Sequence, residues 1–161
     1  MSASEGTGRS IGVAVAEIVV ARLPHSDYSD AQAFYRSVGY AGVISREDFV
    51  VGAKLQGTWV GLARLSSEQR CLTLRGMQVS EAFQRRRIGS LLLEALGRQI
   101  ADEECFCLPH EWLAKFYGQI GFDRIADAEA PAFLQDRLRV GREKHASMIV
   151  MRRQAARDRT A

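Results

Sequence analysis

Residues 71–94, with the sequence CLTLRGMQVSEAFQRRRIGSLLLE, decide the predicted fold. Cys71–Val79 is rich in β-forming residues and predicts a buried strand, while the residues from Ile88 onward have the apolar spacing of an amphipathic helix. A short loop with three arginines joins the two. Because the first N–H groups of a helix have no intrahelical acceptor, residues 84–90 can offer backbone donors and the positive end of the helix dipole to an anion. The stretch therefore predicts a phosphate-binding site, and a ligand with a diphosphate is the first hypothesis.

The composition is that of one globular domain with a hydrophobic core. The chain has 161 residues, of which 47% are hydrophobic, and a formal net charge of +3. Its arginines gather in the loop at 85–87 and in the segments 137–144 and 152–159. The last segment has no aromatic residues between its positive charges, so we expect a solvated terminus and no nucleic-acid partner.

The cysteines and the N-terminus favour a cytoplasmic protein. Cys71, Cys105 and Cys107 are odd in number, and the last two lie one residue apart in an apolar run, which suits buried reduced thiols better than a disulfide or a zinc site. His25 and His145 have no neighbouring ligand residues, so we expect no metal. No apolar run approaches the roughly 20 residues of a spanning helix, and the N-terminus lacks the pattern of a secretory signal. We therefore expect no membrane partner.

Upstream of the deciding stretch, the sequence predicts a strand at 16–23, a short helix and a hairpin. The helix has its cap at Ser29 and Asp30, its buried side chains at Ala33, Phe34 and Val38, and its end at Gly39. The hairpin joins Phe49–Leu55 to a strand at 58–65 through Gln56 and Gly57, and a turn at 66–70 follows. Cys71–Val79 is then the third antiparallel strand, with a bulge expected at Gly76.

Downstream, the spacing predicts two helices, a short buried strand between them at 105–108, and a final strand. The inner face of the first helix is predicted at Ile88, Leu91, Leu92, Ala95, Leu96 and Ile100. The second helix is predicted over 111–120, with Trp112, Leu113, Phe116, Tyr117 and Ile120 facing inward and Gly121 as its end. Residues 126–140 indicate a loop and a short helix, and residues 146–153 the last strand.

A strand–helix–strand unit after an antiparallel meander predicts an α+β fold with a mixed, mainly antiparallel sheet and helices on its faces. We expect a flexible leader over 1–15, one domain over 16–153 and a polar tail over 154–161.

Two motifs make the chain resemble the GNAT superfamily of acetyl-CoA-dependent N-acetyltransferases, from about residue 17 to residue 153. The first is VSEAFQRRRIGS at 79–90, similar to the family pattern of Gln or Arg, two residues, Gly, one residue, and Gly or Ala. The second is AKFYGQIGF at 114–122, similar to the family's helix that ends in Phe-Tyr, three residues and Gly-Phe. Their order, with one helix and one strand between them, supports the resemblance.

The chain departs from the family pattern at three positions. Arg87 takes the place of the first motif glycine, and we expect a right-handed helical conformation there because a positive φ would strain an arginine. His110 takes the place of a frequent Asn and Leu113 that of a frequent Ala.

The resemblance implies a GNAT-like fold with a splayed strand pair that binds the coenzyme, and acetyl-CoA as the acetyl donor. The pantetheine arm would pair with the backbone of Met77, Gln78 and Val79 like an added strand, and the loop from Gln84 to Ser90 would hold the diphosphate. The implied coenzyme-binding residues are Met77, Gln78, Val79, Gln84, Arg85, Arg86, Arg87, Ile88, Gly89, Ser90 and His110.

Acetyl transfer requires a neutral amine, and a lysine-like amine with a pKa of about 10.4 is protonated at neutral pH, so a base or a water relay must remove a proton. The candidate bases are Glu47, Asp48, Glu111 and His110, and position alone does not single one out; we carry Glu111 as the catalytic candidate. Tyr117 is the candidate acid that protonates the departing thiolate. The alternative for Tyr117 is a core tyrosine, and for His110 a hydrogen bond within a turn.

The predicted function is therefore direct transfer of an acetyl group from acetyl-CoA to a primary amine of a small molecule or amino-acid-like metabolite, by a monomer or homodimer. One alternative is a protein N-terminal or lysine acetyltransferase, with a peptide groove between the first helix and residues 126–144. A second alternative is a non-catalytic acyl-CoA-binding module. Fold alone does not choose the acceptor.

Overall fold

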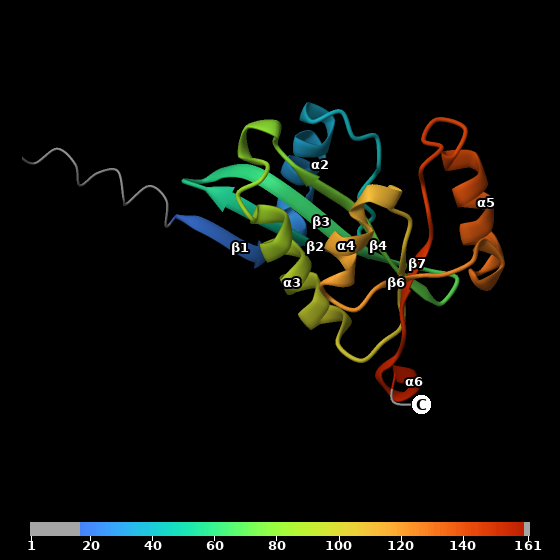
Figure 1. The fold of residues 1–161 in the computed structure, drawn as a ribbon. Coiled ribbons are helices and arrows are strands. Elements are labelled where there is room, and N and C mark those ends of the chain that lie inside the picture. Colours follow the sequence, from blue (N-terminus) through green and yellow to red (C-terminus); the bar gives the residue numbers. More distant parts are fainter. Residues whose placement is uncertain (1–16, 160–161) are drawn as a thin grey trace, which may run out of the picture.

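The computed structural model describes residues 17–159, which form a seven-stranded sheet with helices on both faces (Figure 1). The strand order is β1-β2-β3-β4-β5-β7-β6. The strands are β1 (Ile18–Arg22), β2 (Phe49–Leu55), β3 (Thr58–Glu68), β4 (Cys71–Val79), β5 (Cys105–Cys107), β6 (Asp123–Arg124) and β7 (Met151–Arg153). The helices are α2 (Tyr28–Ser37), α3 (Ile88–Ile100), α4 (Ala114–Gly118), α5 (Ala132–Gly141) and α6 (Ala156–Arg159).

The sheet is antiparallel except at β4 and β5, which are parallel because α3 crosses between them. The predicted mixed sheet is therefore confirmed. Helices α3 and α4 pack on one face over the largest core cluster, while α2 and α5 each cover a smaller cluster on the other face. The leader expected at 1–15 lies outside the described residues, and residues 154–159 include α6.

The hairpin of β2 and β3 agrees with its turn chemistry, because Gln56 and Gly57 both have positive φ, at 51° and 81°. The next turn is shorter than predicted. β3 runs on to Glu68, and only Gln69 and Arg70, also with positive φ, connect it to β4. The expected turn at 66–70 is wrong because Ser66 and its two successors pair with the first residues of β4.

Helix α3 buries a slightly different face from the one predicted: Leu93 is buried and Leu91 is exposed. The buried stripe runs through Ile88, Leu92, Leu93, Leu96 and Ile100. Leu91 lies outside this stripe. Because it comes three residues after Ile88, it is rotated to the side of Ile88 that faces away from Leu92 and Leu93.

Helix α2 begins at Tyr28 after Asp27, so Ser29 and Asp30 lie in its first turn and do not cap it. Its buried residues are Ala31, Phe34 and Tyr35, while Ala33 is exposed. Gly39 ends the helix region as predicted, with φ of 79°.

The predicted helix at 111–120 is a 3-10 turn, Glu111–Leu113, followed by the short α4. Tyr117 is buried, but Trp112 is 71% exposed, because the 3-10 turn places it outside the inner face of α4. Gly121, with φ of 94°, follows α4 as expected. Among residues 17–159, no helix has the length and apolar character needed to cross a membrane.

Candidate functional site

β4 and β5 diverge, which leaves part of β4 with a neighbour on one side only. The two strands pair in parallel at Thr73 and Phe106, yet β4 continues to Val79 beside β3. The register of β3 and β4 shifts opposite Gly76, whose φ is 66°, so the predicted bulge is confirmed. The backbone of residues 77–79 is therefore open on the β5 side to an extended ligand.

The loop that follows β4 forms a cradle of backbone donors. Arg87 precedes α3 without a side-chain cap, and the first hydrogen bond of the helix runs from the Leu91 N–H to the Arg87 carbonyl, at 3.1 Å. The N–H groups of Ile88, Gly89 and Ser90 therefore point out of the helix end. Such an end favours anions such as phosphate.

The expectation of a right-handed conformation at Arg87 is wrong. Its φ is 66° and its ψ is 10°, and Arg85 also has a positive φ, of 64°. Left-handed residues within a turn direct successive N–H groups to one side, which builds a concave anion site. The loop thus retains the shape that a glycine would favour, and both arginines carry backbone strain.

One contact joins this loop to the end of β4, and a second brings the start of α3 close to α4. Gln84 donates a hydrogen bond from Nε2 to the carbonyl of Val79, at 3.1 Å. Gly89 lies where α3 approaches α4, since a Cβ there would be 3.3 Å from a ring carbon of Phe116. The N-terminus of α3, the N-terminal part of α4 and the end of β4 therefore converge.

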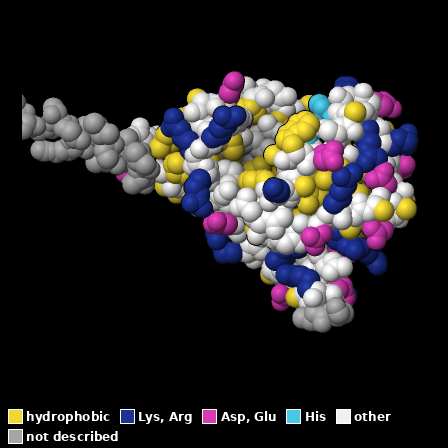
Figure 2. Space-filling view, in the orientation of Figure 1, with side chains coloured by type: hydrophobic (Ala, Val, Ile, Leu, Met, Phe, Trp, Pro, Cys, Tyr) yellow, Lys and Arg dark blue, Asp and Glu magenta, His cyan; other side chains and the backbone are white. Residues whose placement is uncertain are grey.

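The surface above this convergence is hollowed. Figure 2 shows Lys and Arg side chains gathered over the loop before α3, across the hollow from a hydrophobic patch over the start of α4. The exposed Trp112 belongs to the 3-10 turn before α4 and stacks on His110, with ring centroids 4.4 Å apart.

Tyr117 projects from α4 into the core and is 6% exposed. Its ring meets Phe116 and Phe122 edge-on. Burial raises the pKa of Tyr117, and the neighbouring Cys107 raises it further, so the phenol carries its proton at neutral pH. Among residues 17–159, no residue forms a hydrogen bond with the Tyr117 hydroxyl.

The four candidate bases have different surroundings. Asp48 is 6% exposed and forms an ion pair with Arg64, from Oδ2 to Nε at 3.2 Å. Glu47 is exposed and accepts a hydrogen bond from Ser45, which lowers the pKa of its carboxyl.

The other two candidates lie at the start of the 3-10 turn before α4. Glu111 is exposed and forms an ion pair with Arg124, at 3.1 Å. The Nδ1 atom of His110 is 2.8 Å from the Ser147 hydroxyl oxygen. His110 is thus linked to a residue 37 positions further along the chain and not to the turn after Pro109, and Glu111 keeps a solvent-facing carboxylate.

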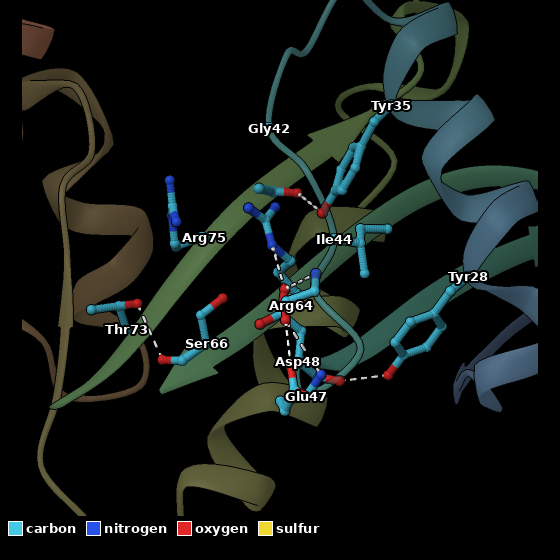
Figure 3. A network of polar contacts seen from close by, with 12 residues as sticks. Tyr28, Tyr35, Gly42, Ile44, Glu47, Asp48, Arg64, Ser66, Thr73 and Arg75 are labelled. Carbon is cyan, nitrogen blue, oxygen red and sulfur yellow. Dashed lines mark hydrogen bonds and ion pairs between the residues drawn. The ribbon is translucent and has the colours of Figure 1, made fainter. Parts of the chain in front are cut away.

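A buried network around Arg64 lies next to the bulge, and no sequence motif predicted it (Figure 3). Arg64 is fully buried on β3, pairs with Asp48, and donates from Nη1 to the Tyr40 hydroxyl at 3.2 Å. Tyr35 donates its hydroxyl proton to the carbonyl of Gly76, at 2.8 Å. A lone arginine in the apolar run WVGLARL was the signal available in the sequence.

The same network fixes the conformation of the bulge. Burial raises the pKa of Tyr35 to about 12, despite the opposing charge of Arg64, so its phenol remains a hydrogen-bond donor. A Cβ at Gly76 would be 2.3 Å from Arg64 Nη1 and 2.4 Å from the Tyr35 hydroxyl oxygen. Gly76 is therefore required by space as well as by its positive φ.

Within residues 17–159, no cluster of three or more His, Cys, Asp or Glu side chains is arranged to hold a metal ion.

Comparisons with known proteins agree with this geometry. The family model described as "Acetyltransferase (GNAT) domain" matches residues 46–124, which include the bulge, the loop and both motifs. A comparison with curated proteins gave no match.

Solved structures with the same fold include three acetyltransferases. N-acetylglutamate synthase from Neisseria gonorrhoeae, complexed with coenzyme A and N-acetyl-glutamate, has a TM-score of 0.63 and 18% identity over 86% of this chain and 35% of its own. An acetyltransferase of the GNAT family from Staphylococcus aureus has a TM-score of 0.60 and 14% identity, over 86% of this chain and 99% of its own. The PaiA N-acetyltransferase from Thermoplasma acidophilum, in complex with coenzyme A, has a TM-score of 0.55 and 17% identity, over 85% of this chain and 98% of its own.

The chain spans about a third of the length of the synthase, and most of the length of the other two proteins. The splayed strands, the donor cradle before α3 and the family match lead to one conclusion: residues 46–124 carry a GNAT acetyltransferase domain, and the chain has the fold of that superfamily.

Proposed function

We propose that the protein transfers the acetyl group of acetyl-CoA directly to the primary amine of a small, amino-acid-like metabolite. The observation that carries this proposal is the open edge of β4 beside the N-terminus of α3. An extended arm can add to the edge as a strand, while its diphosphate meets the backbone donors of the loop.

The residues present fit a coenzyme A molecule. The edge of residues 77–79 has no strand beside it on the β5 side, and the uncapped start of α3 has free N–H groups beside three arginines. The residues proposed to hold it are Met77, Gln78, Val79, Gln84, Arg85, Arg86, Arg87, Ile88, Gly89, Ser90 and His110. When bound, its thioester supplies an activated acetyl group.

Two side chains are proposed to move protons. Tyr117 keeps its phenolic proton at neutral pH, which makes it a donor to the thiolate that leaves. Glu111 presents an exposed carboxylate, which can accept the amine proton through water. Asp48 is a poorer candidate, because its carboxylate already neutralises a buried guanidinium.

Neighbouring structures support an amino-acid-like acceptor. The synthase from Neisseria gonorrhoeae is complexed with N-acetyl-glutamate, an acetylated amino acid. At 18% identity this likeness supports the choice of acceptor class and leaves the individual amine open.

The test combines coenzyme binding with turnover. Purified protein is titrated with CoA by calorimetry, and thiol release from acetyl-CoA is followed with a panel of amines and amino acids. We expect CoA binding and acetylation of at least one small amine. Absence of both results would refute the proposed function, while CoA binding without turnover on any amine or peptide would favour a binding module.

Variants test the two proton-transfer roles. Glu111→Gln is expected to lower kcat with little change in CoA affinity, if Glu111 is the base. Arg124→Gln removes only the partner of Glu111 and serves as the matched control. A Glu111→Gln enzyme with unchanged kcat would exclude Glu111 as the base.

A further inference from the structure

A polar strip crosses the sheet face that lies between α2 and α5. Side chains alternate between the two faces of a strand, and Ala63, Leu65, Leu74 and Met151 point to the α3 face. The side chains between or beside them therefore point to the opposite face. We define the polar strip as Arg64, Ser66, Thr73, Arg75 and Arg152.

Two arginines of the polar strip oppose each other directly. Arg64 on β3 and Arg75 on β4 are register partners, next to the bulge at Gly76. Figure 3 shows them on adjacent strands, with their guanidinium groups directed the same way. Like charges opposite one another destabilise a sheet unless another group compensates them.

The compensation from the protein is incomplete. Arg75 shares the Glu68 carboxylate with Arg137 of α5, at 3.2 Å and 2.6 Å. Arg64 has the single carboxylate of Asp48. The guanidinium groups of Arg64, Arg75 and Arg137 are thus paired with only two carboxylates. Arg152 adds a fourth positive charge to the polar strip. Burial lowers the pKa of Arg75, and the charges of Arg137 and Arg64 lower it further.

Hydrogen-bond donors are also left over on this face. Arg64 Nη2 and Arg152 Nε are buried and have no hydrogen-bond partner among residues 17–159. Arg75 donates from Nη1 only, so no described residue accepts from its Nε or Nη2. These two atoms form one edge of the guanidinium, which matches the two oxygens of a carboxylate.

Arg75 is placed to meet a ligand. Its side chain is 33% exposed and that of Arg137 is 29% exposed, whereas Arg64 lies beneath them, fully buried. Arg75 immediately precedes Gly76 and the open backbone of residues 77–79, which is proposed to hold the pantetheine arm that carries the acetyl group. A group bound at Arg75 would therefore bring its attached amine to the site of transfer.

We propose that Arg75, with Arg137 and the charge of Arg64, binds a carboxylate of the acceptor, so that the substrate class is amino acids and related amino carboxylates; this inference rests on the proposed function. The carboxylate balances the third guanidinium and accepts from the free Nε and Nη2 of Arg75. The same positive charges disfavour the protonated form of an amine held beside them. The polar strip thus selects the acid and favours the reactive neutral amine.

The experiment compares amino acids with their α-carboxamides as acceptors in the full-length protein. Each pair differs only in the carboxylate, and kcat/KM is measured from thiol release. We expect the wild-type protein to prefer the acid by about tenfold or more, since a charge-assisted hydrogen bond is lost in the amide. Arg75→Gln is expected to bring this ratio close to one and to leave the CoA Kd unchanged.

Two further variants control for charge and folding. Arg139→Gln removes a positive charge from α5 at the exposed pair with Asp136, outside the polar strip, and should keep the preference. Arg137→Gln changes an α5 side chain that reaches Glu68 and should reduce the preference even if Arg75→Gln fails to fold.

The outcomes separate this inference from the proposed function. Equal turnover of acids and carboxamides, or an unchanged ratio in both Arg75→Gln and Arg137→Gln, would overturn the inference and leave the acetyltransferase function intact. No CoA binding and no turnover would instead refute the proposed function. If CoA binds without turnover, calorimetric titration of the CoA-saturated protein with the same pairs decides the preference.

Discussion

Replacing Arg87 by glycine should stabilise the protein, although it removes a charged side chain from the loop before α3. Arg87 has a φ of 66°, in the left-handed region. An L-residue pays roughly 1–2 kcal/mol for this conformation, whereas glycine adopts it without penalty. The substitution Arg87→Gly therefore relieves strain that the sequence pattern of the family avoids.

The net magnitude includes the unfolded state. Glycine loses more backbone entropy on folding than other residues, which costs about 0.5–1 kcal/mol. Subtracting this from the relieved strain leaves a stabilisation of about 0–1.5 kcal/mol for Arg87→Gly. Arg86, which lies between Arg85 and Arg87, does not have a positive φ. Arg86→Gly should therefore destabilise the protein by about 0.5–1 kcal/mol.

The assay is urea unfolding of the two variants beside the wild-type protein. Both substitutions remove one exposed arginine of the same loop, so the electrostatic effect of the lost charge is matched. The contact of Arg86 with the Phe83 ring, at 5.5 Å, adds a small loss to Arg86→Gly. We expect the free energy of unfolding of Arg87→Gly to exceed that of Arg86→Gly by about 0.5–2.5 kcal/mol.

Arg85→Gly extends the test, since Arg85 also has a positive φ, of 64°. Its free energy of unfolding should resemble that of Arg87→Gly. If Arg87→Gly and Arg85→Gly are as destabilising as Arg86→Gly, the loop does not hold Arg85 and Arg87 in the left-handed conformation. The explanation from backbone strain would then be wrong.

Three further predictions follow from burial and close contacts. Tyr117→Phe should lower kcat by about 100-fold with little change in CoA Kd, because it removes the proposed acid; an unchanged kcat would remove that role. Gly76→Ala should lower the free energy of unfolding by about 1–3 kcal/mol more than Gly57→Ala. Both glycines have positive φ, but only at Gly76 would the new Cβ lie 2.3 Å from an Arg64 atom. Equal losses of stability in urea unfolding would contradict this prediction. Cys71 should react with a thiol reagent at pH 8 in the native protein, while Cys105 should react only on unfolding. Burial raises the pKa of Cys105 to about 12, so little of its thiolate is present at pH 8. Rapid reaction of every thiol without denaturant would refute this prediction.

Several elements could be predicted from the sequence because their causes are local. Gln56 and Gly57 specify a tight turn by their tolerance of positive φ, and the alternation on either side specifies the strands. The bulge at Gly76 and the end of α2 at Gly39 follow from the same property. The order of strand, basic loop and helix likewise fixed where free N–H groups would lie.

Other predictions failed where distant segments compete with local preference. Local sterics favour a right-handed Arg87, but the chain enters α3 through a turn in which Arg87 is left-handed. Trp112 has the apolar character of a core residue, yet the 3-10 turn before α4 places it outside. Neither result is encoded in the spacing of the residues alone.

The sequence by itself determined the succession of elements, the mixed sheet, the basic loop before the helix at residue 88 and the two GNAT motifs, because periodicity and turn chemistry act between residues that are close along the chain. Only the tertiary structure decided which charges meet. Arg64 reaches Asp48 across 16 residues, Tyr35 reaches the Gly76 carbonyl across 41, and Arg137 reaches Glu68 across 69. These contacts depend on strand register and on the packing of α2 and α5 against the sheet, which no local pattern specifies.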